Sequence, residues 1–305
     1  MMQESHSTLL DRISELKVKR NAVILAHNYQ LGEVQDIADF VGDSLELSQN
    51  AARTKADVIV FCGVHFMAET ASILSPDKTV LLPDLAAGCP MANMINADDM
   101  RQLKDEHPDG MAVCYINTSA EVKAECHFCC TSANAVRVVQ AIDAREIIFV
   151  PDQYLGAYVS QQTGRDMILW PGYCPTHARI RAADIRRLRN TYPAADILVH
   201  PECRPEVIEL ADHVLSTGGM IRHAKATHNS QMIIGTEIGI IHRLRKENPG
   251  KTFIPVSEQA VCPRMKLITL ESILWSLEDL SPEVRVPEEI RLKARRAVDR
   301  MLEVA

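Results

Sequence analysis

The chain contains an internal threefold repeat, which constrains its fold more than any other feature. Three Cys-Pro pairs follow apolar runs and are separated by 85 and 88 residues: Cys89-Pro90, Cys174-Pro175 and Cys262-Pro263. With 9 cysteines and 15 prolines among 305 residues, chance predicts only about 0.4 such pairs. A period of about 86 residues exceeds the roughly 20 to 50 residues of solenoid repeats, so it indicates three similar small domains.

Two further features recur in the same register. Apolar runs end in polar triplets that begin 88 and 85 residues apart, at His27, Tyr115 and His200. About 15 residues after each triplet a small hydroxyl residue opens a helix-like segment, again with separations of 88 and 85 residues: Ser44, Ser132 and Thr217. Three separate features that keep one spacing do not arise readily by an accident of composition.

Each repeat contains three short apolar runs, typical of buried strands, with amphipathic helical segments between them. The runs are 22–26, 58–61 and 80–82, then 112–114, 147–150 and 167–170, then 197–199, 232–234 and 253–256. Strands that alternate with helices predict a parallel sheet with helical crossovers. We therefore predict an α/β protein of three similar small three-layer domains with parallel sheets. If these domains pack with pseudo-threefold symmetry, their polar edges can surround one central cluster.

Length alone would suggest two domains, and the repeat replaces that estimate with three. The predicted divisions are an N-terminal helix at 1–20, α/β domains at 21–109, 110–194 and 195–280, and a C-terminal helical tail at 281–305.

Composition and charge exclude several classes of protein. The chain has 40 acidic and 33 basic residues, a formal net charge of -7, so it shows no basic footprint for nucleic acid. Apolar runs such as 22–26 and 58–62 are too short to cross a bilayer, and the charged opening segment 1–20 does not resemble a secretory signal. We predict a cytoplasmic protein with neither a nucleic-acid nor a membrane partner.

The three Cys-Pro cysteines are candidates for a metal site. Polar groups that follow parallel strands gather at one edge of the sheet, so Cys89, Cys174 and Cys262 can converge if the three edges face one centre. Proline suits the first position of a helix, which would place each cysteine at a helix cap where the thiolate is favoured. Three thiolates suit an iron–sulfur cluster or zinc. In a [4Fe–4S] cluster, three ligands would leave one iron open as a Lewis acid. Buried structural thiols are the alternative.

The remaining cysteines fit different roles. The run Cys126-His127-Phe128-Cys129-Cys130 could be half of a zinc site or a redox pair, although the second pair that a structural zinc needs is not evident. Cys62, Cys114 and Cys203 adjoin strand ends, where cysteine is more often a packed small residue than a ligand.

The hydroxyl residues and the polar triplets together indicate an anion-binding active site. Ser44, Ser132 and Thr217 are plausible helix caps, and three helix termini pointing to one centre would favour negative charge. The triplets supply acid–base and hydrogen-bonding groups: His27, Tyr29, Tyr115, Asn117, His200 and Glu202. With the cysteines, this pattern predicts an enzyme for a small polyanion.

In combination these residues resemble the quinolinate synthase family over positions 21–275. The strings that carry the resemblance are 26–30 (AHNYQ), 42–44 (GDS), 115–119 (YINTS), 130–135 (CTSANA), 200–203 (HPEC), 216–218 (STG) and the three Cys-Pro pairs. The resemblance implies three α/β domains in a triangle around a [4Fe–4S] cluster held by three cysteines. It also implies condensation of iminoaspartate with dihydroxyacetone phosphate to quinolinate, with release of phosphate and water, in de novo NAD synthesis.

The resemblance also assigns expected roles, position by position. Cys89, Cys174 and Cys262 match the cluster ligands, and His27, Tyr29 and Glu202 match acid–base and substrate-positioning residues. Matching substrate-binding positions are Ser44, Met67, Tyr115, Asn117, Ser132, His177, His200 and Thr217. Some relatives carry a Cys-x-x-Cys switch just before the third ligand, but residues 257–261 (SEQAV) lack it here. A functional link to L-aspartate oxidase or aspartate dehydrogenase is also expected.

Two other classes remain open at this point. A zinc-thiolate hydrolase would contain zinc and no visible chromophore, whereas an iron–sulfur protein is brown. A non-catalytic iron–sulfur sensor would more naturally close all ligand positions, and a DNA-binding sensor should carry a basic element. Neither the fourth ligand nor the basic element is evident in the sequence.

Overall fold

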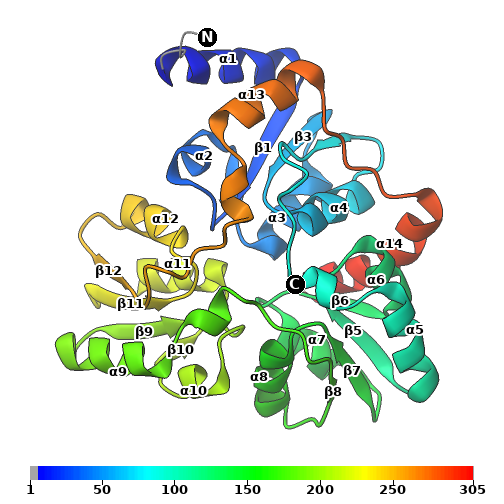
Figure 1. The fold of residues 1–305 in the computed structure, drawn as a ribbon, viewed down its shortest axis with the longest axis vertical. Helices are drawn as coiled ribbons and strands as arrows, with labels where there is room; N and C mark the ends of the chain where they lie inside the picture. Colours follow the sequence, from blue (N-terminus) through cyan, green and yellow to red (C-terminus); the bar gives the residue numbers. More distant parts are fainter. Residues whose placement is uncertain (1–5, 305) are drawn as a thin grey trace.

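A computed structural model describes residues 6–304 and contains three parallel sheets of four strands each (Figure 1). All three have the same strand order, in which the first strand of the unit lies between the second and the third. The first sheet is β2-β1-β3-β4, built from β1 (Ala22–His27), β2 (Phe40–Gly42), β3 (Val58–Cys62) and β4 (Thr79–Leu81). The chain is therefore α/β, as predicted.

The second and third sheets follow the same order. The second is β6-β5-β7-β8, with β5 (Met111–Tyr115), β6 (Phe128–Cys130), β7 (Ile147–Val150) and β8 (Ile168–Leu169). The third is β10-β9-β11-β12, with β9 (Asp196–Val199), β10 (His213–Val214), β11 (Gln231–Gly235) and β12 (Thr252–Pro255).

Helices cover both faces of these sheets. Around the first sheet lie α2 (Gly32–Ile37), α3 (Ser44–Arg53), α4 (His65–Leu74) and α13 (Leu270–Asp279). Around the second lie α5 (Ala97–Glu106), α6 (Ala120–Glu125), α7 (Ala135–Ala141) and α8 (Gln153–Thr163), and around the third lie α9 (Ala182–Thr191), α10 (Pro205–Ile208), α11 (Thr217–Ala226) and α12 (Ile240–Glu247). The last helix of each chain segment therefore packs on the next sheet, and it is preceded by a 3₁₀ helix: η1 (Ala92–Met94), η2 (His177–Arg179) or η3 (Met265–Leu267).

Each sheet has one strand more than the apolar runs indicated. The additional strands are the edge strands β2, β6 and β10, which pair in parallel with the first strand of each unit. They are two or three residues long, and β2 and β10 are only partly buried, so they lack the continuous apolar run that marks a buried strand. Their carboxyl ends add a further set of polar residues to the same edge of each sheet.

The buried strands explain why these segments fold as they do. All five residues of β3 are buried, as are all four residues of β7. Strands that are apolar on both faces belong in a parallel sheet with helices on each side. One continuous hydrophobic core extends through all three units and includes Leu198 and Met232 of the third sheet, while Ile197, Val207 and Ile233 belong to a second, smaller core in the third unit.

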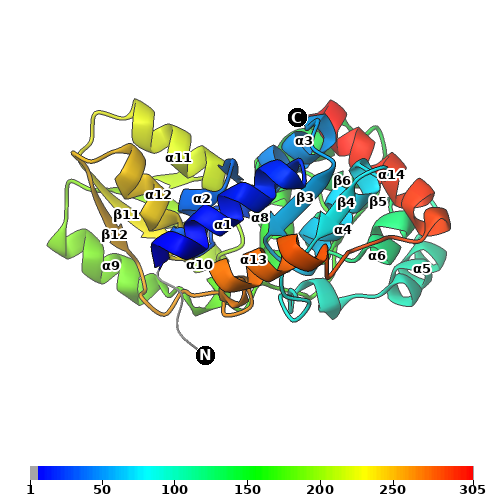
Figure 2. The ribbon, with the colours of Figure 1, turned by 90° about the horizontal axis from the view of Figure 1, so that it is seen from above.

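The terminal helices join units that are distant in sequence. Helix α1 (His6–Lys19) packs against α13, and α14 (Glu288–Glu303) packs against α6 and β6 of the second unit (Figure 2). The first five residues of the predicted N-terminal helix lie outside the described residues. Because α14 buries Ala297, Val298 and Met301, its packing against α6 and β6 stabilises the second unit.

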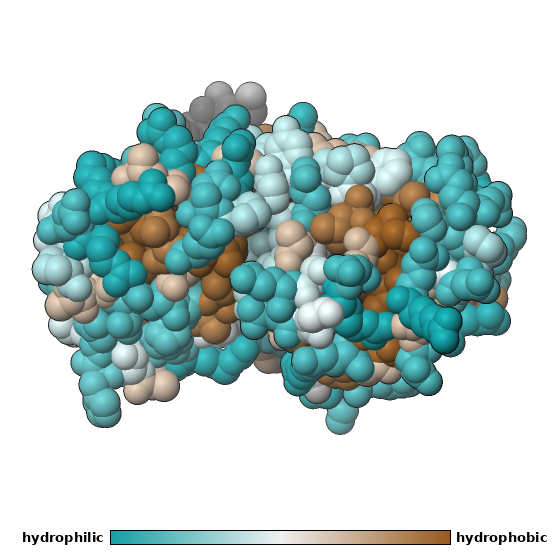
Figure 3. Space-filling view, turned by 90° about the horizontal axis from the view of Figure 1, so that it is seen from below, coloured by the Kyte–Doolittle hydropathy of each residue, from teal (hydrophilic) through white to brown (hydrophobic). Residues whose placement is uncertain are grey.

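On the face shown in Figure 3, hydrophobic groups lie in areas bordered by hydrophilic side chains. Among the described residues, no helix is long and apolar enough to cross a membrane.

Candidate active site

A cavity lies where the carboxyl ends of the three sheets meet. Every residue predicted for the site lines it: His27, Tyr29, Ser44, Met67, Cys89, Tyr115, Asn117, Ser132, Cys174, His177, His200, Glu202, Thr217 and Cys262. His27 ends β1 and Tyr115 ends β5, while His200 directly follows β9. Residues at equivalent positions of the three repeats therefore line the same cavity.

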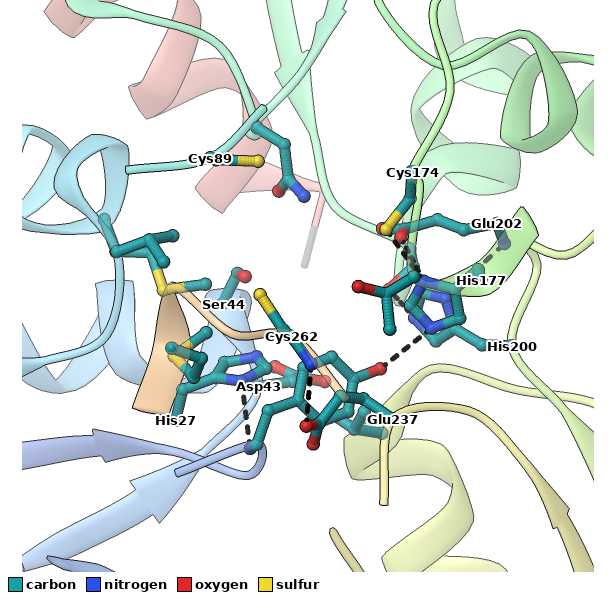
Figure 4. Close-up of a pocket in the computed structure, with 18 of the residues that line it drawn as sticks. His27, Asp43, Ser44, Cys89, Cys174, His177, His200, Glu202, Glu237 and Cys262 are labelled. Carbon is teal, nitrogen blue, oxygen red and sulfur yellow. Dashed lines mark hydrogen bonds and ion pairs between the residues drawn. The ribbon is translucent and has the colours of Figure 1, made fainter. Parts of the chain in front are cut away.

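The three Cys-Pro cysteines point into this cavity from three separate loops (Figure 4). Each loop follows the last strand of its unit, and each cysteine lies three residues before a 3₁₀ helix, η1, η2 or η3. The loops contact one another, since Trp170 Nε1 donates to the Met94 carbonyl at 2.7 Å. Among the described residues no cysteine forms a disulfide.

The prediction that these cysteines cap α-helices is wrong. Each Cys-Pro pair precedes a single 3₁₀ turn, and the next α-helix begins eight residues after the cysteine, at Ala97, Ala182 or Leu270. A three-residue 3₁₀ helix does not sum its peptide dipoles as a long α-helix does. Instead, individual backbone N–H groups from Ala92, His177 and Met265 hydrogen bond to the three sulfurs.

Burial dominates the acidity of the three thiols. It raises the pKa of Cys89 to about 12 and places the pKa of Cys174 well above its ordinary value, despite the backbone N–H groups that act in the other direction. Burial likewise raises the pKa of Cys262. Thiolates in this buried cavity therefore need a compensating positive charge. A bound metal ion would supply that charge and so favour loss of the thiol protons. The donor set fits a soft metal centre.

A second group of potential ligands lies beside Cys174. One ligand atom from each of Cys174, His177 and Glu202 lies within 4.8 Å of the other two, and Nδ1 of His177 is 3.1 Å from the Cys174 sulfur. The cavity is thus compatible with metal binding through cysteines, with histidine and carboxylate groups next to them.

His27 and His200 occupy equivalent positions and have the same hydrogen-bonding pattern. The backbone N–H of Tyr29 donates to Nδ1 of His27, and that of Glu202 donates to Nδ1 of His200. Burial lowers the pKa of each ring to about 3, although Glu202 acts to raise it. Each imidazole is therefore neutral and carries its proton on Nε2, where it is a hydrogen-bond donor. Nε2 of His200 lies 3.2 Å from the Ser132 hydroxyl.

Glu202 is the centre of a buried polar network. Its Oε2 lies 2.7 Å from Nδ1 of His177, and its Oε1 accepts a hydrogen bond of 2.5 Å from the Tyr115 hydroxyl. Burial acts to raise the pKa of Glu202, but His177, His200 and the hydrogen bonds outweigh it and hold the pKa well below its usual range. The carboxylate is therefore ionised, and both of its oxygens have partners.

Tyr29 belongs to a second network on the opposite wall. Its hydroxyl lies 2.5 Å from Oγ1 of Thr236 and 3.3 Å from Nε2 of His177. Burial, together with Glu202, raises the pKa of Tyr29 well above its ordinary value, so the phenol keeps its proton. His177 therefore connects the two networks through its two ring nitrogens.

The hydroxyl residues do not cap their helices, contrary to the prediction. Asp43 caps α3, and its carboxylate accepts hydrogen bonds from the backbone N–H groups of Leu45 and Glu46. Ser216 caps α11 through the N–H of Gly219. Asp43 and Ser216 each lie one residue before the predicted cap, at the extended residue that precedes the first helical residue, which is the position of an N-cap. In the second unit Ser132 lies three residues before α7.

This arrangement changes how the cavity can bind an anion. The first free N–H groups of α3 are occupied by Asp43, so the hydroxyls of Ser44, Ser132 and Thr217 are the groups that remain for a ligand. Of the described residues that line the cavity, none is lysine or arginine. An anion bound in this cavity would therefore meet neutral hydrogen-bond donors rather than lysine or arginine side chains.

Sequence reasoning missed several residues that shape the site. Glu237 is fully buried, lines the cavity and accepts a hydrogen bond from the backbone N–H of Cys262 at 3.1 Å. It follows β11 at the point where Asp152 follows β7, so the strand-end rule that found the triplets could also have found it. Asn28 is fully buried and donates to Thr217 Oγ1 at 2.9 Å.

The cysteine run of the second unit lies outside this cavity. Cys126, Cys129 and Cys130 are buried, and the Cys129 sulfur is 3.3 Å from that of Cys114 on the neighbouring strand. These thiols pack inside the second sheet and do not line the cavity. The structure therefore separates them from the three Cys-Pro cysteines.

The fold and the cavity define a class of protein: an α/β protein with a cavity that brings three cysteines together with buried histidine, tyrosine and carboxylate side chains. The chain belongs to the quinolinate synthetase A protein family, whose family model matches residues 11–303. It is 61% identical over 293 residues to a quinolinate synthase of Dehalococcoides mccartyi (strain CBDB1), a match that covers 96% of this chain and 97% of the relative.

Two further relatives carry the same name. Quinolinate synthase 1 of Methanosarcina acetivorans is 56% identical over 296 residues, which cover 97% of both chains. Quinolinate synthase of Geobacter sp. (strain M21) is 54% identical over 300 residues, or 98% of this chain and 99% of the relative. The similarity therefore spans all three sheets and both terminal helices.

Proposed function

We propose that the protein condenses iminoaspartate with dihydroxyacetone phosphate to quinolinate, releasing phosphate and water, with a [4Fe–4S] cluster held by Cys89, Cys174 and Cys262. The observation that carries this proposal is the convergence of the three cysteines with His27, Tyr29, Glu202 and the other predicted residues on one cavity. Membership of the quinolinate synthetase A family supports the reaction.

The donor set supports a cluster with one iron free of protein thiolates. A [4Fe–4S] cluster ordinarily takes four cysteines, and the other cysteines of the described chain do not line the cavity. When bound, the cluster supplies a Lewis-acidic iron for a substrate oxygen. The chain places Glu202 and His177 beside the Cys174 ligand, so proton-handling groups lie next to that centre.

Protons are handled by the two networks that His177 connects. Glu202 is ionised, and its Oε1 accepts a hydrogen bond from the Tyr115 hydroxyl. When the Tyr115 oxygen takes a proton from the substrate, the phenolic proton can pass to the Glu202 carboxylate at the same time. The Tyr29 hydroxyl keeps its proton and lies near the same histidine. We assign Glu202 as the proton acceptor during dehydration and ring closure, and Tyr29 and the neutral His27 as hydrogen-bond donors that position and polarise the reacting groups.

Substrate is held by neutral hydrogen-bonding groups. The Nε2–H of His27 and the hydroxyls of Ser44, Ser132 and Thr217 can donate to carboxylate or phosphate oxygens. Asn117 lines the cavity with its side-chain oxygen buried and without a hydrogen-bond partner among the described residues. A buried unpaired acceptor costs about 1–3 kcal/mol, so it favours a ligand that brings a donor, such as a substrate hydroxyl or imine N–H.

The cellular setting follows from this chemistry. We place the protein in the cytoplasm, where thiols that must bind a metal remain reduced. Iminoaspartate carries an imine that hydrolyses in water, so it must be used soon after it forms. We therefore expect a functional link to an enzyme that forms it from aspartate, such as L-aspartate oxidase or aspartate dehydrogenase. We also propose that the chain divides into three domains at 21–109, 110–194 and 195–280, each with one sheet.

The deciding experiment measures metal, sulfide and turnover on the same anaerobically purified protein. We expect about four iron and four sulfide per chain and formation of quinolinate from the two substrates. Zinc without sulfide would overturn the cluster assignment and favour a zinc-thiolate hydrolase. A full cluster with no turnover of either substrate would overturn the reaction and favour an iron–sulfur sensor.

A further inference from the structure

The third unit contains a group of ligands far from the active site. We propose that Asp196, His213 and His223 bind a divalent transition-metal ion, of which zinc is the best match. One ligand atom from each residue lies within 4.8 Å of the other two. Nε2 of His223 is 3.2 Å from Oδ2 of Asp196, and the ring centroids of His213 and His223 are 4.2 Å apart.

These residues lie at the sheet edge opposite the cavity. Asp196 is the first residue of β9, and His213 is the first residue of β10. His223 lies in the last turn of α11, away from the Thr217 end that lines the cavity. Because the cavity is at the carboxyl ends of the same strands, the proposed ion would not share a ligand with the cysteine site.

The internal repeat shows that the fold does not require these side chains. Strand β10 pairs with β9 as β6 pairs with β5 and β2 with β1, so His213 is equivalent to Phe128 and Phe40. At the same spacings of 85 and 88 residues, Asp196 corresponds to Met111 and Val23, and His223 corresponds to Val138 and Asn50. Two units fill these places mainly with packing side chains, and only the third carries three metal-binding groups.

The carboxylate is oriented by neighbouring groups. Asn229 Nδ2 donates to Oδ1 of Asp196 at 3.0 Å, and the Thr227 hydroxyl donates to Oδ2 at 3.4 Å. Hydrogen bonds of this kind commonly fix the direction of a ligating carboxylate. Asn229 also donates to the Ala194 carbonyl at 2.7 Å, which ties the amide to the chain just before β9.

The donor set selects the class of ion. Two imidazoles and one carboxylate suit zinc and its neighbours among the divalent transition metals, whereas calcium and magnesium prefer oxygen ligands only. His213 is exposed, and the side chains of His223 and Asp196 are 20% and 24% exposed. An ion can therefore enter from solvent, and water can complete a tetrahedral coordination.

An ion bound to these three residues would stabilise β10, the shortest strand of the third sheet. Strand β10 has only two residues and pairs with β9 alone. The chain runs directly from it through Ser216, the α11 cap, to Thr217 in the cavity wall. A bond from the ion to His213 would join β10 to β9 and α11, and so would stabilise the segment that presents Thr217.

The test titrates Zn²⁺ into the anaerobic, cluster-containing protein after brief treatment with a chelator and desalting, with a fluorescent zinc indicator as competitor. We expect one equivalent of zinc bound and a higher thermal midpoint. The double variant His213→Phe, His223→Val takes the residues of the second unit at these positions, and we expect its affinity to fall by at least about 100-fold. Asp196→Asn, which keeps the shape of the side chain, should weaken binding by about 10-fold or more.

His228→Gln is the matched control, because His228 is exposed on the same unit but is not one of the three ligands. Its zinc affinity should equal that of the parent chain. Absence of zinc binding, or equal binding by the double variant, would overturn the proposal. Co²⁺ separates the two kinds of site, since intense thiolate-to-cobalt absorption that persists in the double variant would assign the bound ion to cysteines instead.

Discussion

The carboxylate of Glu202 lies 2.7 Å from Nδ1 of His177, although Glu202 follows β9 of the third unit and His177 begins η2 of the second. Both side chains are almost completely buried, at 4% and 2% exposure. A charge that is buried to this degree must be paired, because removal of one partner leaves the other without compensation. The pair therefore ties the second unit to the third at the wall of the active site.

Replacement of Glu202 by glutamine should separate the proton-handling role from cluster binding. The amide keeps the size of the side chain but cannot accept the Tyr115 proton. We expect an unchanged iron and sulfide content and a kcat at least about 100-fold lower, measured by quinolinate formation. Glu206→Gln is the control, since Glu206 is exposed four residues further on. A near-normal kcat for Glu202→Gln would exclude an essential proton transfer at this residue.

Replacement of Cys174 by serine should abolish the cluster. A serine oxygen is a harder and less acidic ligand than a thiolate, and iron–sulfur clusters depend on thiolate ligation. We expect a colourless protein with little iron or sulfide and no turnover. Cys203→Ser is the control, because Cys203 is fully buried nearby but does not line the cavity. Full iron and sulfide content in Cys174→Ser would show that Cys174 is not a ligand.

Much of this arrangement could be predicted from the sequence because both the apolar runs and the strand-end residues repeat in register. The rule that ligand groups gather at the carboxyl ends of parallel strands needs no knowledge of how the units pack. It therefore placed Cys89, Tyr115 and His200 at sheet edges, and the structure brings them to one cavity.

Other features depend on contacts that a local pattern does not contain. Strand β2, at Phe40–Gly42, is too short and too exposed for hydrophobic periodicity to reveal it. The Glu202–His177 pair requires two units to be packed at a particular angle. The raised pKa of Cys89 results from burial, which a helix-cap rule does not include. These outcomes belong to tertiary packing rather than to local sequence.

The Ser44 hydroxyl should contribute mainly to substrate affinity. It lines the cavity at the first residue of α3, while Asp43 occupies the nearby backbone N–H groups. One lost hydrogen bond to a charged group is worth about 1.5–3 kcal/mol, so Ser44→Ala should raise the KM of one substrate by about 10-fold or more with a smaller effect on kcat. Ser48→Ala, one turn further along, removes a hydroxyl that bonds to the Ser44 carbonyl and should leave KM unchanged. Equal effects of the two variants would contradict a direct role for the Ser44 hydroxyl.

Asn28 should hold the first and third units together at the site. It donates to Thr217 Oγ1 and accepts a hydrogen bond from Arg243 Nη1 at 2.8 Å, and its side chain is fully buried. Asn28→Ala removes both hydrogen bonds, which should lower the free energy of unfolding by about 1–3 kcal/mol and raise KM, although Arg243 keeps its bonds to the Val41 carbonyl and Glu247. Asn50→Ala, which removes a local bond to the Glu46 carbonyl, should cost less. Denaturant titration of the two variants measures the difference.

A surface charge group also joins the first unit to the third and should make stability depend on pH. Asp36 in α2 contacts Lys246 at 2.5 Å and Nε2 of His242 at 3.0 Å, both in α12. Burial acts to raise the pKa of Asp36, but the hydrogen bonds from Lys246 and His242 outweigh it and hold the pKa below its ordinary value. The folded protein therefore binds the Asp36 proton less tightly than the unfolded chain does.

A lowered carboxyl pKa stabilises the fold above the pKa of the unfolded chain, and the contribution is lost as pH falls through the folded value. All three side chains are more than a third exposed, so the contribution is at most about 1 kcal/mol. Asp36→Asn should therefore lower the thermal midpoint by about 1–2 °C at pH 7, and the difference should shrink below about pH 4 and in high salt. Glu33→Gln removes the same charge from the first turn of α2 and should show a smaller shift. A difference between the two variants that persists unchanged at low pH would mean that Asp36 acts through packing rather than through its charge.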